Sequence, residues 1–171
     1  MKQWFETKLT IGAFPYLVNE EFDAEDFDII INVSDEFHYS QYWLTPNLKC
    51  FWFPMNESKK DIGLNSIYGS MVILKWAEFL NKRVYLHCHS GVNRSRAVQA
   101  AYYYMRVGTQ YKPTTRRNNY ENALVAMCSR GYLPPKKEME SFLTILGDKI
   151  NEGVVKGGTL DSCKMAAINN F

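Results

Sequence analysis

Cysteine is scarce in this 171-residue sequence: four residues, with no CxxC pair and no spacing typical of a zinc site. This argues against a disulfide-stapled secreted fold. No apolar run approaches the roughly 18 residues that a membrane-spanning helix needs. The first ten residues also lack the continuous apolar segment of a secretory signal. We therefore expect a cytoplasmic protein with reduced thiols and no membrane partner.

The sequence also has little excess of either charge. Its formal net charge is +2 at pH 7, which is too small to predict binding to nucleic acid. Hydrophobic residues are plentiful, at 46%, whereas charged residues make up 22%. These proportions are typical of a folded globular protein, and the length suits one domain with a sizeable core. Nothing in the sequence indicates an oligomeric state.

Short apolar runs alternate with segments of helical periodicity along the chain. The apolar runs predict strands at residues 8–11, 27–33, 48–53 and 83–87. The periodic segments predict helices at about residues 66–81, 95–106, 119–130 and 135–149. This alternation indicates an α/β fold, a single domain in which helices flank a central, largely parallel sheet. We assign residues 1–150 to this domain and the Gly-rich residues 151–171 to a C-terminal tail.

The segment between the strand at 83–87 and the helix at 95–106 carries the candidate chemistry. A loop that turns from a strand into a helix N-terminus aims several backbone N–H groups at one point, which suits a phosphate. Gly91 permits the positive φ or the close approach that such a turn needs. Arg94 can offer a planar fork to two phosphate oxygens. The predicted phosphate-binding residues are His89, Ser90, Gly91, Val92, Asn93 and Arg94.

Cys88 is the predicted nucleophile of this loop. Helix N-termini and nearby cations lower the pKa of a cysteine from ~8.5 to as little as ~4–6, so we expect Cys88 to be a thiolate. A thiolate can attack phosphorus and form a phosphocysteine. Ser95 could donate a hydrogen bond to the sulfur and help it leave in the second step. His87 would orient the loop by hydrogen bonding without touching the substrate.

The whole loop, His87-Cys88-His89-Ser90-Gly91-Val92-Asn93-Arg94-Ser95, resembles the HCxxGxxR[ST] signature of the cysteine-based protein tyrosine phosphatase superfamily. Three further segments resemble its compact dual-specificity branch: Leu9-Thr10-Ile11-Gly12, Ile31-Asn32-Val33-Ser34-Asp35-Glu36, and YENALVAMCSRGYLPP from Tyr120. Together they cover roughly residues 8 to 146. The resemblance implies hydrolysis of phosphomonoesters, with phosphotyrosine and phosphoserine/threonine proteins as the substrate partners. It also implies a shallow pocket, no metal and no cofactor.

The resemblance further implies a general acid, which protonates the leaving oxygen, on a loop upstream of the cysteine. In the family this acid is an Asp about thirty residues before the cysteine, shortly after a strand-ending Pro. Here Glu57 follows Pro54 at that position, and Asp61 lies four residues later on the same loop. Position favours Glu57 and residue type favours Asp61, and a third interpretation makes both of them solvated loop charges.

Two other functions compete with a general phosphatase. RNA 5′-triphosphatases of the same superfamily resemble HCTHGxNRT, and Asn93-Arg94 matches the end of that pattern. His89, Ser90 and Ser95 depart from it, and the low net charge makes a nucleic-acid partner the less favoured prediction. A phosphate-binding module without catalysis is disfavoured, because such proteins usually lose the cysteine or the arginine and this chain has both.

Overall fold

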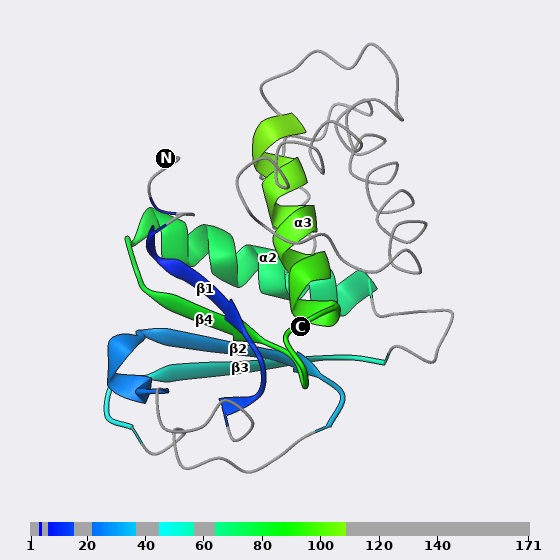
Figure 1. The fold of residues 1–171 in the computed structure, drawn as a ribbon. Helices are drawn as coiled ribbons and strands as arrows, with labels where there is room; N and C mark the ends of the chain where they lie inside the picture. Colours follow the sequence, from blue (N-terminus) through cyan, green and yellow to red (C-terminus); the bar gives the residue numbers. More distant parts are fainter. Residues whose placement is uncertain (1–3, 5–6, 16–21, 37–44, 57–63, 109–171) are drawn as a thin grey trace. The chain divides into compact units, whose positions relative to one another are not determined.

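The computed structural model describes Trp4 and residues 7–15, 22–36, 45–56 and 64–108 (Figure 1). The chain divides into two compact units, Met1–Ser95 and Arg96–Phe171. The first unit contains a four-stranded sheet and the helix α2 (Leu64–Phe79), and the helix α3 (Arg94–Gly108) starts at its end and supplies the described part of the second. The helices predicted at 119–130 and 135–149 and the tail lie outside the described residues. Within the described ranges, no helix combines the length and the apolar character needed to cross a bilayer.

The sheet is formed by β1 (Leu9–Gly12), β2 (Ile29–Ser34), β3 (Lys49–Met55) and β4 (Val84–His87), in the order β1-β4-β2-β3. Every pairing between neighbouring strands is parallel, which confirms the predicted α/β fold with a parallel sheet. Because parallel strands end at the same edge, the segments that follow all four strands meet there (Figure 1). That edge is where the predicted phosphate loop begins.

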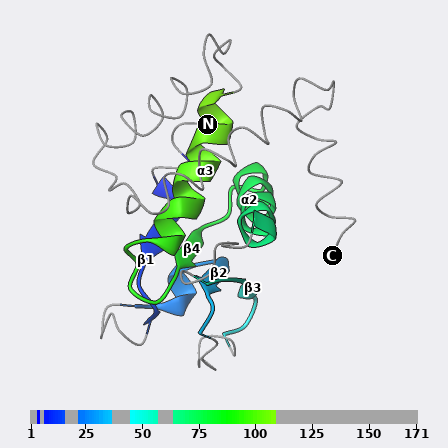
Figure 2. The ribbon, with the colours of Figure 1, turned by 90° about the vertical axis from the view of Figure 1, so that its right-hand side faces the viewer.

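Strand β2 is buried along its whole length, which explains why its sequence, IIINVS, is a nearly continuous apolar run. On one face, α2 packs against β2 and β3 (Figure 2). On the other face, Ile30 and Tyr85 are covered by partly buried apolar side chains from Phe22, Ala24, Phe27, Leu48 and Cys50. Part of this cover comes from a 3-10 helix, η3 (Ala24–Asp26), which the sequence analysis did not predict.

Helix α2 ends earlier than the predicted residue 81, and Asn81 is the reason. Asn81 has a φ of 53°, in the left-handed region that ends helices. The backbone N–H of Lys82 donates to Ala77 O at 2.8 Å, and that of Asn81 donates to Glu78 O at 3.1 Å. These two bonds form a Schellman motif, which satisfies carbonyl groups of the last turn. The apolar periodicity of the sequence extends through Leu80, so the helix predicted from it ends too late.

Strand β3 also differs from its prediction, because it continues through Pro54 instead of stopping before it. Proline has no N–H for the ladder, but β3 is an edge strand, where the missing donor is tolerated. The pairing shifts register at this point: Trp52 pairs with Asn32 and Met55 pairs with Ser34. Two residues on β3, Phe53 and Pro54, thus lie opposite one residue on β2, Val33. This bulge places the end of β3 beside the end of β2, at the edge where the phosphate loop begins.

Candidate active site

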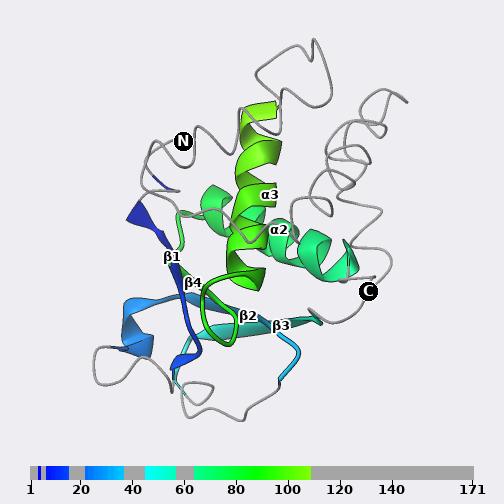
Figure 3. The ribbon, with the colours of Figure 1, turned by 45° about the vertical axis from the view of Figure 1, so that its right-hand side comes forward.

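The loop between β4 and α3 contacts the chain just beyond β1. The two segments lie side by side in Figure 3. The backbone N–H of Phe14 donates to His89 O at 2.9 Å. Gly91 has a φ of +70°, and a Cβ placed on it would lie 2.6 Å from both the backbone nitrogen of Ala13 and the carbonyl carbon of Gly12. Both observations require glycine here, one through the dihedral and the other through the close approach. The predicted need for glycine at this position is confirmed on both grounds.

We expect Gly91→Ala to lower kcat/KM on p-nitrophenyl phosphate by about a hundredfold, because a displacement of about 1 Å at reacting groups can cost that much. The new methyl group would overlap backbone atoms, which yield less readily than a flexible side chain. The thermal denaturation midpoint, measured in parallel, separates a displaced loop from an unfolded protein. Wild-type kinetics in a folded Gly91→Ala variant would contradict this account of the loop.

Cys88 lies fully buried at the start of the loop, with Ser95 fully buried beside it. The Cys88 Sγ lies 3.4 Å from the Ser95 Oγ. Burial raises the pKa of Cys88, but hydrogen bonds from the Ser95 hydroxyl and from the backbone N–H groups of Ser95, Asn93 and Gly91 outweigh it. The net effect holds the pKa of this thiol below its ordinary value. The site can therefore stabilise a thiolate through N–H groups that converge on the sulfur.

We expect Ser95→Ala to raise the pKa of Cys88, because the thiolate loses its side-chain hydrogen bond. Alkylation by iodoacetamide consumes thiolate, so the pH at which Cys88 reacts at half its maximal rate should move upward in the variant. Cys50 is an internal reference, since burial raises its pKa to about 11. Peptide mapping by mass spectrometry follows both residues in one sample. An unchanged profile for Cys88 would show that Ser95 does not stabilise the thiolate.

His87 occupies the last position of β4 and is fully buried. Burial lowers its pKa to about 4, although its contact with the Cys88 carbonyl acts in the opposite direction. Nδ1 lies 3.3 Å from Cys88 O, and because a carbonyl only accepts, this contact requires a proton on Nδ1. The ring also packs edge-on against Phe14, with centroids 5.1 Å apart. This neutral imidazole can fix the loop beside the nucleophile.

Arg94 is buried, and its guanidinium contacts two segments of the sheet edge. Nη1 donates to Met55 O at 3.0 Å, to a carboxylate oxygen of Glu36 at 3.2 Å, and to a carboxylate oxygen of Asp35. Asp35 and Glu36 end one of the segments that resemble the family, but no role was predicted for them from the sequence. Their position directly after a buried parallel strand could have indicated a role in the site, because such strands end at the ligand-binding edge of an α/β sheet.

The remaining predicted residues divide into three groups. His89, Ser90 and Val92 form the exposed rim of the loop. Asn93 is 6% exposed and directs its backbone N–H at the sulfur, so its side chain is less available at the surface than those three. The candidate acids Glu57 and Asp61 lie outside the described residues, and their roles stay predictions.

Residues 9–115, well over half of the chain, match the family described as "Dual specificity phosphatase, catalytic domain". The match runs without a break from the first compact unit into the second. A comparison with curated proteins found no match.

Solved structures share the fold at low sequence identity. OH1 from the Orf virus is 17% identical, with a TM-score of 0.61 over 83% of this chain and 82% of OH1. PTPMT1 in complex with PI(5)P is 17% identical, with a TM-score of 0.63 over 88% and 96% of the two chains. Human DUSP28 is also 17% identical, with a TM-score of 0.60 over 86% and 93%. The fold agrees with the family match, and the chain therefore belongs to the dual-specificity phosphatase catalytic domains, a family of cysteine-based phosphatases.

Proposed function

We propose that this protein hydrolyses phosphomonoesters of phosphotyrosine and phosphoserine/threonine in proteins, through a phosphocysteine formed on Cys88. The observation that carries the proposal is the convergence of the Ser95 hydroxyl and three backbone N–H groups on a buried thiol whose pKa they lower. Burial without such donors raises the pKa of a cysteine, as it does for the half-buried Cys50. The family match supports the same chemistry.

The proposed reaction has two steps. The Cys88 thiolate attacks phosphorus, a sulfur–phosphorus bond forms, and the bond from phosphorus to the substrate oxygen breaks. The departing oxygen takes a proton from the general acid, for which Glu57 and Asp61 are the candidates. Water then attacks phosphorus and gives a proton to the carboxylate that the first step left behind. The sulfur leaves as thiolate, stabilised by Ser95, so that inorganic phosphate is released. Arg94 neutralises charge on the phosphoryl oxygens throughout.

The exposed rim of the loop supports a protein substrate. His89 and Ser90 are exposed, and Val92 is 42% exposed, so the loop lies open to phosphorylated side chains carried by a folded partner. Two structural relatives indicate which substrates to compare. OH1 is described as a tyrosine phosphatase with triple substrate specificity, and PTPMT1 was solved with PI(5)P.

Initial rates on matched substrates test the proposal. Wild-type protein would be compared on a phosphotyrosine peptide, a phosphoserine peptide, PI(5)P in detergent and a 5′-triphosphorylated RNA, with phosphate release as the common readout. We expect both peptides to give higher kcat/KM than either other substrate. Cys88→Ser is the control for contaminating phosphatases. A tenfold or larger preference for PI(5)P or RNA would refute the protein-substrate proposal and would favour a lipid phosphatase or an RNA triphosphatase.

A further inference from the structure

The proposed reaction does not explain the contacts that residues 32–36 make. This segment includes the last residues of the buried strand β2 and ends in two adjacent acids whose carboxylates both contact Arg94. We propose that Asp35 and Glu36 are positioning residues, which hold the Arg94 guanidinium in place for substrate phosphate before the substrate arrives. This inference rests on the proposed function in one respect, that Arg94 binds the phosphate.

The contacts around Arg94 are suited to fixing its orientation. Nη1, which has two protons to donate, lies within hydrogen-bonding distance of acceptors on Asp35, Glu36 and Met55. Hydrogen bonds between ionised groups are stronger than neutral ones. Because both N–H bonds of Nη1 lie in the guanidinium plane, acceptors from the ends of two strands limit the rotation of that plane. A guanidinium ordered in advance loses less entropy when phosphate binds.

The two acids are in turn held by a turn at the end of β2. Oδ1 of Asn32 accepts from the Ser34 backbone N–H at 2.8 Å. The Ser34 hydroxyl, which has one proton to donate, lies 2.7 Å from the same Oδ1 and 3.0 Å from Glu36 O. From the edge strand, the indole N–H of Trp52 donates to Ser34 O at 2.8 Å. The backbone that carries Asp35 and Glu36 is therefore fixed from two strands.

The bulge in β3 supplies the third acceptor. Because of the register shift at Pro54, Met55 pairs with Ser34, which places its carbonyl beside the acidic pair. The Met55 side chain is fully buried, so this part of the edge strand is anchored in the core. Arg94 is thus surrounded by acceptors from the ends of both β2 and β3. The bulge in β3 therefore helps to place the acceptor that Met55 offers to Arg94.

The opposite interpretation is that the two acids compete with phosphate for Arg94. The solvent exposure of the three side chains decides between the positioning role and this competing role. The Arg94 side chain is 7% exposed, whereas those of Asp35 and Glu36 are 33% and 42% exposed. Solvent therefore reaches both carboxylates and weakens their repulsion of a phosphate, while the guanidinium that they orient stays shielded. Burial raises the pKa of Glu36, but a backbone hydrogen bond and the contact with Arg94 outweigh it, so the net pKa of Glu36 is lowered.

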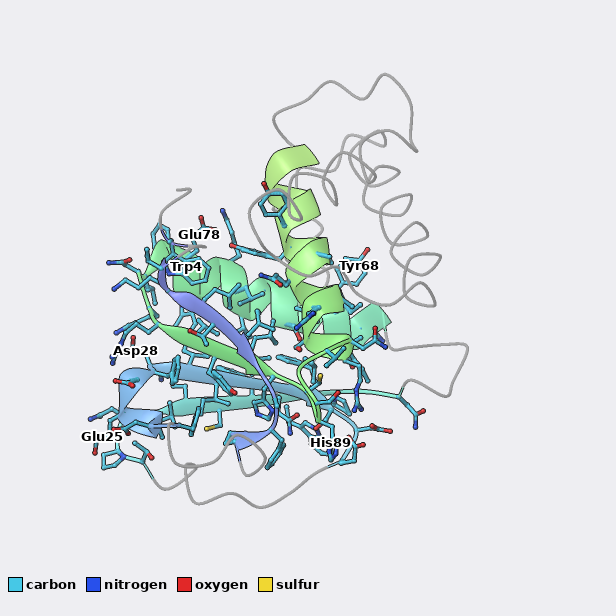
Figure 4. The ribbon with its side chains drawn as sticks, viewed as in Figure 1. Trp4, Glu25, Asp28, Tyr68, Glu78 and His89 are labelled. Carbon is cyan, nitrogen blue, oxygen red and sulfur yellow. The ribbon has the colours of Figure 1, made fainter. Side chains whose placement is uncertain are left out.

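Binding of inorganic phosphate to the Cys88→Ser protein tests the proposal without requiring turnover. Asp35→Asn and Glu36→Gln would be introduced into that background, and Kd would be measured by isothermal titration calorimetry. Asp28→Asn is the matched control, because it removes the carboxylate of another Asp–Arg pair, Asp28 with Arg83. Asp28 lies at the opposite edge of the sheet from His89 (Figure 4). Glu36→Asp keeps the charge and tests for partial rescue.

We expect each acid-to-amide change to weaken phosphate binding about tenfold, with Glu36→Asp in between, and Asp28→Asn to leave Kd unchanged. Thermal denaturation midpoints should not follow this order, since loss of stability alone would not change Kd. Unchanged or tighter phosphate binding in Asp35→Asn and Glu36→Gln would overturn the inference. If the wild type proved inactive on every phosphomonoester while these Kd changes were observed, the proposed function would fail and the positioning role would stand.

Discussion

Replacement of Cys88 by serine should abolish hydrolysis of p-nitrophenyl phosphate, with a fall in kcat of about four orders of magnitude or more. A serine hydroxyl is not ionised near neutral pH, and the donors around Cys88 favour a thiolate. Serine differs little in size, so the loop should keep its shape. The effect is measured by the absorbance of the p-nitrophenol that the purified variant and the wild type release.

The control for this experiment is Cys50→Ser. This change replaces a half-buried thiol on β3 that packs against Ile30 and Tyr85. Because Cys50 has a raised pKa and lies within the strand, its replacement should leave kcat within about twofold of the wild type. Comparable activity in Cys88→Ser and wild type would mean that another residue, or water acting directly, attacks the phosphorus.

Replacement of Arg94 by lysine should lower kcat/KM about a thousandfold even though the positive charge is kept. A lysine ammonium cannot present a planar fork to phosphate oxygens while contacting Glu36, Asp35 and Met55 O. The loss should appear in both kcat and KM, because Arg94 would bind the phosphate in the ground state and in the transition state. Steady-state kinetics on p-nitrophenyl phosphate resolve the two parameters.

Arg83→Lys provides the matched control for Arg94→Lys. Arg83 precedes β4, pairs with Asp28 at 3.4 Å and is partly exposed, so the conservative change should be nearly silent. If Arg94→Lys also proved nearly silent, planar recognition by Arg94 could not be part of the mechanism.

The phosphate loop could be predicted from the sequence because its chemistry is local. A strand, Cys88, Gly91, Arg94 and the start of a helix follow one another within a short stretch, and each has a requirement that few other residues meet. The parallel sheet was predictable for a related reason. A strand buried on both faces, such as Ile29–Ser34, is a nearly continuous apolar run.

Features that depend on pairing between distant segments could not be predicted in the same way. Asp35 and Glu36 contact Arg94 across more than fifty positions of sequence, and their role depends on the order of the strands. Pro54 usually ends a strand, and it lies inside β3 only because that strand forms the edge and bulges there.

Detection of a phosphorylated Cys88 is the most direct test of the proposed mechanism. The Ser95→Ala variant should accumulate it, because the sulfur loses the hydrogen bond that helps it leave in the second step. The variant would be mixed with p-nitrophenyl phosphate, denatured rapidly and analysed by mass spectrometry of its peptides. The proposed mechanism predicts a phosphate group on the sulfur of Cys88, found on the peptide that contains this residue. Release of p-nitrophenol with no phosphorylated peptide, or with the phosphate on another residue, would contradict it.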